Sequence, residues 1–244
     1  MSVDQSRAPT DMDKQAIRTM LILVASIVVT LLLFYVIPYG RRIAYPLILL
    51  STLIHELGHG IASILCGYEF YEFHMYADGS GVAMTEGGKG PFARAFVSAG
   101  GLVGPSLVAA FFFAMGAHER KARRTLTFFA VALLLAVVLV VRNPFGIVFV
   151  SITAGLCFLV ANWGKPWLSH VLLLFIACQL ALSVFSRGDY LFSKHAVTSD
   201  GLMPSDVQKM ADALLLPYWF WGGLCGLISV FVLFAGLKAS VRKL

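Results

Sequence analysis

Three residues within one pentapeptide, His55, Glu56 and His59, have the types and spacing of a zinc-hydrolase site. The two histidines are four positions apart, so a helix would stack their imidazoles on one face. Both rings would then reach one Zn²⁺ at about 2.0–2.1 Å, with Glu56 beside the first ligand. The metal would lower the pKa of its bound water toward about 7, and Glu56 would act as general base and then as general acid. The pattern predicts a hydrolase.

The element that must position these residues is an apolar stretch, residues 43–66, long enough to be a membrane helix. Ionisable side chains inside a membrane helix cost a few kcal/mol each on insertion scales, so they mark functional positions. Gly58 and Gly60 would let a neighbouring helix or strand approach closely. The alternatives are a polar cluster that only joins helices and a chance occurrence of a short pattern. We favour a functional site at membrane depth.

The composition of the whole chain agrees with a membrane location. Of its 244 residues, 59% are hydrophobic and 13% are charged, and the mean hydropathy is +0.82. Soluble domains are about 45–50% apolar and about 25% charged. The sequence therefore predicts an all-α, multi-pass integral membrane protein with six to seven transmembrane helices, the lower number if Pro144 marks a re-entrant bend. The apolar stretches cover residues 20–37, 43–66, 92–115, 125–141, 145–161, 168–185 and 217–237.

The expected domain organisation is simple. Residues 1–18 form a polar N-terminal segment whose Asp4, Asp11 and Asp13 are unlike a cleaved signal peptide, and residues 19–244 form a single transmembrane domain. After the second span, alternating polar and aromatic residues and the turn Asp78-Gly79-Ser80-Gly81 predict a β-hairpin at residues 68–86. A polar loop is expected at residues 186–216.

Positive charge would distinguish the two membrane faces. If all seven spans cross, ten of the 19 Lys and Arg residues share one face. The rule that cytoplasmic loops hold more Lys and Arg then favours a cytoplasmic basic face and an external N-terminus. The ten are Arg41, Arg42, Arg120, Lys121, Arg123, Arg124, Lys165, Lys238, Arg242 and Lys243.

Several motifs together carry a resemblance to a known family. They are His55-Glu56-Leu57-Gly58-His59-Gly60, Gly79-Ser80-Gly81-Val82, the small-residue run at residues 98–105, and Ser205-Asp206-Val207 followed by Ala211-Asp212, Pro217 and Trp219. The chain resembles the site-2 protease family of intramembrane zinc metalloproteases, most closely its compact bacterial and plant branch of M50B-like peptidases. The resemblance implies a membrane-embedded Zn²⁺ site, a hairpin that presents substrate as an added strand, and cleavage of membrane-embedded or membrane-adjacent peptides.

The third zinc ligand is where the chain departs from that family. Catalytic zinc normally takes three protein ligands, and site-2 proteases usually supply the third as an aspartate before a glycine. Here the closest match is Asn143-Pro144-Phe145-Gly146, and phenylalanine cannot bind zinc. We favour Asp206, because it lies in the family-like run and a carboxylate fits zinc at about 2.0–2.2 Å. The other candidates are Asp189, Asp200 and Asp212, with His170 and His195 behind them.

Two functions from different classes are consistent with these residues. The first is an intramembrane zinc metalloprotease, with Glu56 as the catalytic residue and His55, His59 and Asp206 as metal ligands. The second is a catalytically silent member that acts as a membrane scaffold or assembly factor, which the missing aspartate would favour. The expected partners are the lipid bilayer and a membrane protein or peptide substrate, without nucleic acid. The substrate, the oligomeric state and the identity of the membrane stay open.

Overall fold

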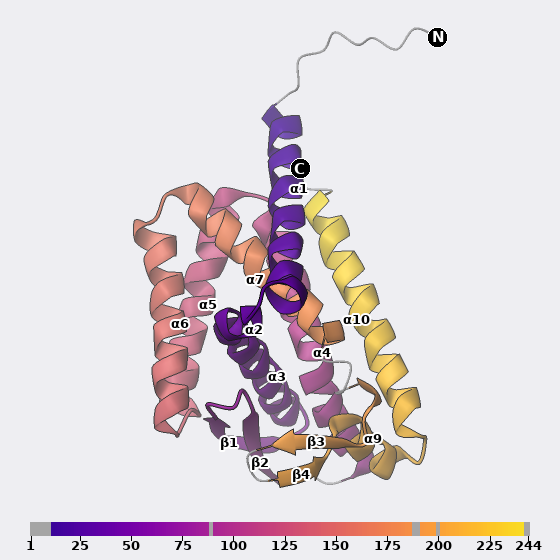
Figure 1. Cartoon of the computed structure of the whole chain (residues 1–244). Helices are drawn as coiled ribbons and strands as arrows, with labels where there is room; N and C mark the ends of the chain where they lie inside the picture. The colour runs from indigo at the N-terminus through magenta and orange to yellow at the C-terminus, as the bar shows by residue number, and fades with distance from the viewer. Residues whose placement is uncertain (1–10, 88–89, 187–190, 199–200, 242–244) are drawn as a thin grey trace, which may run out of the picture.

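A bundle of long apolar helices makes up most of the molecule (Figure 1). The computed structural model describes residues 11–87, 90–186, 191–198 and 201–241. Seven described helices are long and apolar enough to cross a membrane, which confirms the predicted multi-pass all-α fold class. They are α1 (Asp11–Leu31), α3 (Tyr45–Leu65), α4 (Pro91–Gly116), α5 (Glu119–Leu139), α6 (Pro144–Trp163), α7 (Pro166–Ser186) and α10 (Tyr218–Val241).

Prolines set several of the helix starts. Pro91, Pro144 and Pro166 are the first residues of α4, α6 and α7, a position where the missing N–H costs nothing. The residue before a proline disfavours helical backbone, so Asn143 and Pro144 separate α5 from α6. Arg123 at the start of α5 donates to the carbonyl of Asn162 at the end of α6, at 3.1 Å. The two helices are therefore antiparallel, and Pro144 follows a full reversal of the chain.

The start of α1 and the end of α10 lie at the same end of the bundle (Figure 1). Arg18 of α1 forms an ion pair at 2.7 Å with Glu119, the first residue of α5. We call this end, which carries residues 120–124, the basic end. A single π-turn, η1 (Leu32–Val36), and the short α2 (Gly40–Ile43) join α1 to α3, and the chain reaches the opposite end only at the end of α3. The expectation that α1 starts on the face opposite to residues 120–124 is therefore wrong.

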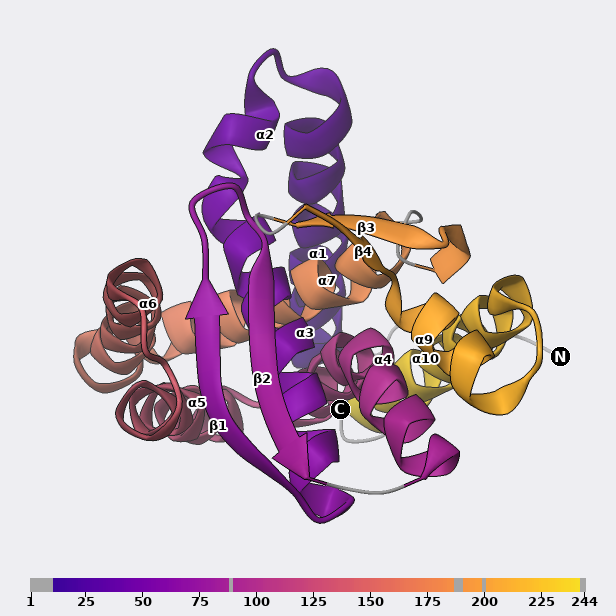
Figure 2. The same ribbon diagram turned by 90° about the horizontal axis from the view of Figure 1, so that it is seen from below.

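The opposite end, which we call the sheet end, carries all four described strands (Figure 2). Strands β1 (Tyr68–Met75) and β2 (Gly81–Gly87) form the predicted hairpin, antiparallel and with a bulge between Phe70 and Glu72. The hairpin lies along α3, because Tyr45 donates to the carbonyl of Ala77 at 2.6 Å and Thr52 donates to that of Gly79 at 2.7 Å. At its turn, hydrogen bonds from Ser80 lower the pKa of the Asp78 carboxyl.

The stretch expected only as a polar loop contains further structure. Strands β3 (His195–Thr198) and β4 (Gly201–Pro204) form a second antiparallel hairpin, and α9 (Asp206–Leu214) follows it. Helix α9 is amphipathic, with Val207 and Met210 buried against Ala95 and Leu102 of α4. These apolar contacts hold the start of α9 against the transmembrane bundle.

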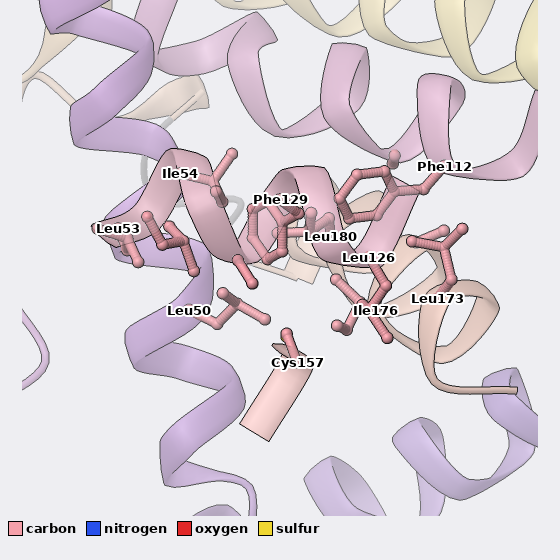
Figure 3. Packing of buried hydrophobic residues seen from close by; sticks show 14 of the residues in the cluster. Leu50, Leu53, Ile54, Phe112, Leu126, Phe129, Cys157, Leu173, Ile176 and Leu180 are labelled. Carbon is pink, nitrogen blue, oxygen red and sulfur yellow. The ribbon is translucent and has the colours of Figure 1, made fainter. Parts of the chain in front are cut away.

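The main hydrophobic core lies between α3, α4, α5, α6 and α7 (Figure 3). Leu50 and Leu53 of α3 belong to the same buried cluster as Leu126 and Phe129 of α5, and Phe112 of α4 stacks edge-on against Phe129 with ring centroids 5.2 Å apart. Because several helices contribute to this core, the backbone of α3 is fixed on the side away from its histidines.

Candidate active site

The structure brings together two histidines of α3 and an aspartate of α9. Nε2 of His55 lies 3.1 Å from Oδ2 of Asp206, and Nε2 of His59 lies 3.2 Å from the same oxygen. The two Nε2 atoms are 3.1 Å apart. The side chains of His55, His59 and Asp206 are 14, 12 and 7% exposed, so the cluster is shielded but accessible.

The geometry of these three atoms fits a metal ion. Ligand atoms about 2.0–2.2 Å from a tetrahedral zinc lie about 3.3–3.5 Å from one another, close to the separations of 3.1–3.2 Å observed here. Among the described residues, His55, His59 and Asp206 are the one group of three His, Cys, Asp or Glu side chains that could converge on an ion. Two imidazoles and a carboxylate are also a donor set that zinc accepts with a fourth position open.

The tautomer of His59 is set by a second hydrogen bond. Its Nδ1 lies 2.8 Å from the carbonyl oxygen of Val97 on α4, which can only accept. Nδ1 therefore carries a proton, and Nε2 is the nitrogen that faces His55 and Asp206. Nε2 can hold a proton that it donates to the carboxylate of Asp206, or it can give up that proton and offer its lone pair to a metal ion.

Asp206 is held by local structure at the start of α9. Ser205 caps the helix, because its hydroxyl accepts from the backbone N–H of Gln208 at 3.2 Å. Lys209, one turn along, donates to the second carboxylate oxygen of Asp206 at 3.2 Å. Burial alone would raise the pKa of Asp206, but electrostatic attraction to His59 and hydrogen bonds with His55 and His59 hold that pKa well below its usual range. Asp206 is thus a carboxylate at neutral pH, the form that binds metals.

Glu56 faces the edge of the first hairpin. Its Oε2 accepts a hydrogen bond of 2.9 Å from the backbone N–H of Ala83 on β2. Gly81 stands beside it, and a Cβ there would come within 2.9 Å of Cγ of Glu56. The carboxylate of Glu56 therefore contacts the edge of β2 and lines the same cleft as the two histidines.

A cleft of about 440 Å³ opens over these groups. One wall is α3 and β2, and the other is β4 and the start of α9. His55, Glu56, His59 and Asp206 all line it, together with Ala83 and Thr85 of β2, Met203 and Pro204 of β4, and Arg94, Lys209 and Asp212. Figure 2 shows the two hairpins on either side of α3 at this end of the bundle. The cleft therefore brings polar and apolar side chains together over the three converging residues.

Glycines on α3 and α4 allow the two helices to approach closely and leave space for the ring of His59. A Cβ on Gly58 of α3 would lie 2.3 Å from the carbonyl oxygen of Gly100 on α4, and a Cβ on Gly101 would lie 2.2 Å from Nε2 of His59. Both distances are far below van der Waals contact. The small-residue run of α4 therefore makes room for α3 and for the ring of His59.

The Asn143-Pro144-Phe145-Gly146 segment has a different place from the one that the family pattern would give it. Phe145 packs against the hydrophobic core. Asn143 accepts from the backbone N–H of Met75 at 3.0 Å and donates through Nδ2 to the carbonyl of the same residue. Val140 accepts from the N–H of Phe73 at 2.7 Å, so this segment occupies the outer edge of β1. The sequence analysis did not predict that Asn143 would bind the edge of β1. A polar residue between two apolar spans could have indicated such a contact.

The other candidate third ligands lie elsewhere or outside the described residues. Asp212 lines the same cleft from α9, and its carboxylate accepts from Gln208 at 2.7 Å. His170 is buried near the start of α7, toward the basic end, and His195 is exposed at the start of β3. Asp189 and Asp200 lie outside the residues that the structure describes.

Comparison with known proteins gives one match. A family model described as Peptidase M50B-like matches residues 22–236, which include the pentapeptide of α3 and Asp206. Neither a curated protein nor a solved structure matches the chain.

Proposed function

The chain belongs to the Peptidase M50B-like family, and from that premise we propose that it is an intramembrane zinc metalloprotease whose metal ligands are His55, His59 and Asp206. The main support for this proposal is the position of Asp206, whose Oδ2 lies 3.1 Å from Nε2 of His55 and 3.2 Å from Nε2 of His59. It supplies a third donor to a chain in which phenylalanine stands at the position of the family aspartate. The helix composition of the molecule places this chemistry in a membrane protein.

The division of work among the side chains follows from their positions. Zinc, when bound, would supply Lewis-acid activation of water and of the scissile carbonyl. Glu56 takes the proton of the attacking water and returns it to the leaving amine. The carbonyl of Val97 fixes the ring of His59, and Lys209 holds the outer oxygen of Asp206.

The substrate enters as an extended strand on the edge of β2. That edge faces the cleft through Ala83 and Thr85, whereas the opposite edge of the hairpin is covered by residues 140–143. Addition of a strand satisfies backbone groups of the substrate and carries its peptide bonds past Glu56. Transmembrane segments must unwind to bind in this way, so the substrates are membrane proteins or peptides with a locally extended segment.

The test uses the purified full-length protein in detergent, with zinc content and peptide cleavage measured on the same sample. We expect about one Zn²⁺ per chain and cleavage of a membrane-derived peptide. Glu56→Gln should keep the metal and abolish cleavage, because an amide cannot accept the proton. His55→Ala should lose both.

Two outcomes would overturn the proposal. A protein that takes up no zinc after loading would remove the metal site and favour the scaffold hypothesis. Zinc binding with cleavage that is unaffected by Glu56→Gln would show that the activity comes from another site or from a contaminant.

A further inference from the structure

Two small hollows extend from His55 along α3, toward the start of that helix. The inner hollow has a volume of about 30 Å³, and its lining includes Ser51, His55, Pro105 and Ser183. The outer hollow has a volume of about 130 Å³, and its lining includes Tyr35, Arg41, Ile48, Ser51, Gln179 and Ser183. Ser51 and Ser183 line both hollows, and His55 lines the inner hollow as well as the cleft. The cleft and the two hollows therefore form one series with shared walls.

The spacing of the lining residues gives this series a direction. Ile48, Ser51 and His55 follow one another at successive turns of α3. Gln179 and Ser183 do the same on α7. From Ile48 to His55 the helix rises by about 10 Å. The hollows thus run between α3 and α7, from the connection of η1 and α2 to the histidine, whereas the cleft reaches the same histidine from β2 and α9.

The walls of the outer hollow are those of a hydrated cavity. Gln179 is 2% exposed, and its Oε1 has no hydrogen-bond partner among the described residues. Ser51 and Ser183 are buried as well, and the hydroxyl of Ser183 donates to the carbonyl of Leu180 at 2.7 Å, so its oxygen can still accept. A buried amide oxygen without a partner costs free energy, and ordered water supplies the partner where a cavity is polar and roomy. The outer hollow has several times the volume of about 30 Å³ that one water occupies.

The inner hollow has room for one water beside His55. Its volume of about 30 Å³ exceeds the roughly 10–15 Å³ that a water needs. Pro105 lines it from inside α4 and has no N–H, so the carbonyl of Gly101 lacks the donor that a helix usually supplies. In membrane helices such carbonyls are satisfied by side chains or by ordered water. The hydroxyls of Ser51 and Ser183 are polar partners for this water, and the freed carbonyl adds an acceptor beside Pro105.

The connection between α1 and α3 forms the mouth of the outer hollow. Tyr35 belongs to the π-turn η1, and π-turns are frequent at functional sites. Tyr39, which follows it, has left-handed backbone with φ of 60°, an uncommon conformation for a residue other than glycine. Arg41 is exposed at the mouth, and among the described residues no carboxylate forms an ion pair with it. A fixed positive charge at a narrow entrance repels metal cations and hydronium and admits neutral water.

We propose that the two hollows are a water entrance to the site, separate from the cleft, with Ser51 and Ser183 as its neck. The use of this entrance rests on the proposed proteolytic function. Hydrolysis of a peptide bond consumes one water, which adds OH to the carbonyl carbon and H to the leaving nitrogen. A peptide strand on β2 covers the site from the cleft, so water reaches His55 through the hollows while substrate is bound. The entrance can be measured without zinc or cleavage, so its failure is distinguishable from failure of the protease proposal.

The separate entrance is tested by thiol labelling of the full chain in detergent, in a Glu56→Gln/Cys66→Ser background that binds peptide without cleaving it. Methyl methanethiosulfonate should modify both Ser183→Cys at the neck and Thr85→Cys in the cleft. Excess of a membrane-derived peptide should protect Thr85→Cys and leave the labelling rate of Ser183→Cys unchanged. Ile48→Trp, which fills the outer hollow, should slow labelling of Ser183→Cys at least about ten-fold and leave Thr85→Cys unaffected.

Three results would overturn the separate entrance. They are a Ser183→Cys that does not react, a Ser183→Cys that the peptide protects as strongly as Thr85→Cys, and labelling of Ser183→Cys that Ile48→Trp leaves unchanged. If the peptide protects neither cysteine, strand addition at β2 fails, and the effect of Ile48→Trp still decides whether the route runs through the outer hollow.

The supply of water during turnover is tested by closing the neck. Ser183→Leu places an apolar side chain between the two hollows, so the cleavage rate at saturating peptide should fall several-fold while zinc content and peptide affinity stay constant. The matched control is Leu182→Phe, which adds bulk at the next position of α7 without lining either hollow, and it should cleave normally. A full cleavage rate in Ser183→Leu, or an equal loss in both variants, would overturn the supply role. An unchanged thermal unfolding midpoint shows that each variant is folded.

Discussion

Oδ2 of Asp206 lies 3.1 Å from Nε2 of His55, although 151 positions separate the two residues in the chain. His55 belongs to a transmembrane helix and Asp206 to the short helix after the second hairpin. The contact depends on α9, whose buried Val207 and Met210 dock on α4. A carboxylate from a short helix near the end of the chain thereby meets two imidazoles of a helix long and apolar enough to span a membrane.

The first prediction concerns Asp206 itself. Asp206→Ala should lower zinc affinity by more than about 100-fold, beyond the 10–100-fold cost of losing an outer-shell partner, because a direct ligand is removed. Asp212→Ala is the matched control, since Asp212 lies on the same helix and lines the same cleft. Competition titration with a zinc chelator measures both. Equal affinities of the two variants would assign the third ligand elsewhere.

The second prediction tests the space that α4 leaves for His59. In Gly101→Ala the new methyl group would meet the imidazole at 2.2 Å, so the ring must rotate away from its position beside His55. We expect zinc affinity to fall about 10–100-fold, as when a ligand loses its orientation. Gly155→Ala, also in a transmembrane helix but with open space around its Cβ, should change nothing. If Gly101→Ala binds zinc normally, the ring does not depend on this glycine.

The third prediction concerns the clamp on β1. Asn143→Ala leaves the N–H and the carbonyl of Met75 without their side-chain partner, which costs about 1–3 kcal/mol when such groups are buried. The hairpin should exchange its amide hydrogens faster and cleavage should fall, while zinc stays bound. Asn162→Ala, which loses an exposed hydrogen bond within α6, serves as the control. Slow exchange in Asn143→Ala would argue against the clamp.

The fourth prediction addresses strand addition at β2. The N–H of Ala83 points out of the hairpin toward Glu56, so alternation along the strand directs the N–H of Thr85 the same way. Thr85→Pro removes this donor without breaking the β1–β2 ladder. Peptide cleavage should fall while zinc content stays constant. Thr85→Val, which keeps the N–H and the branched shape, should cleave normally. Full activity of Thr85→Pro would exclude docking on this edge.

Some features could be predicted from the sequence because their causes are local. Apolar stretches of membrane-spanning length determine the helices, and prolines at residues 91, 144 and 166 determine where three of them begin. The four-residue spacing of His55 and His59 places both rings on one helical face whatever surrounds them. The hairpin at β1 and β2 follows from its alternating pattern and its Asp78-Gly79-Ser80-Gly81 turn.

Contacts between residues far apart in the sequence were decided only by the tertiary structure. Helix α9 docks through Val207 and Met210, and their three-residue spacing predicts an apolar helical face without saying which helix that face contacts. The direction of α1 depends on η1 and α2, short elements whose geometry hydropathy does not encode. Asn143 acquires its role from the neighbouring strand, and Gly101 acquires its role from the ring of His59. Local composition determined the helices and the first hairpin, whereas long-range packing positioned Asp206 beside the histidines, Asn143 beside β1, and the cleft at the sheet end of the bundle.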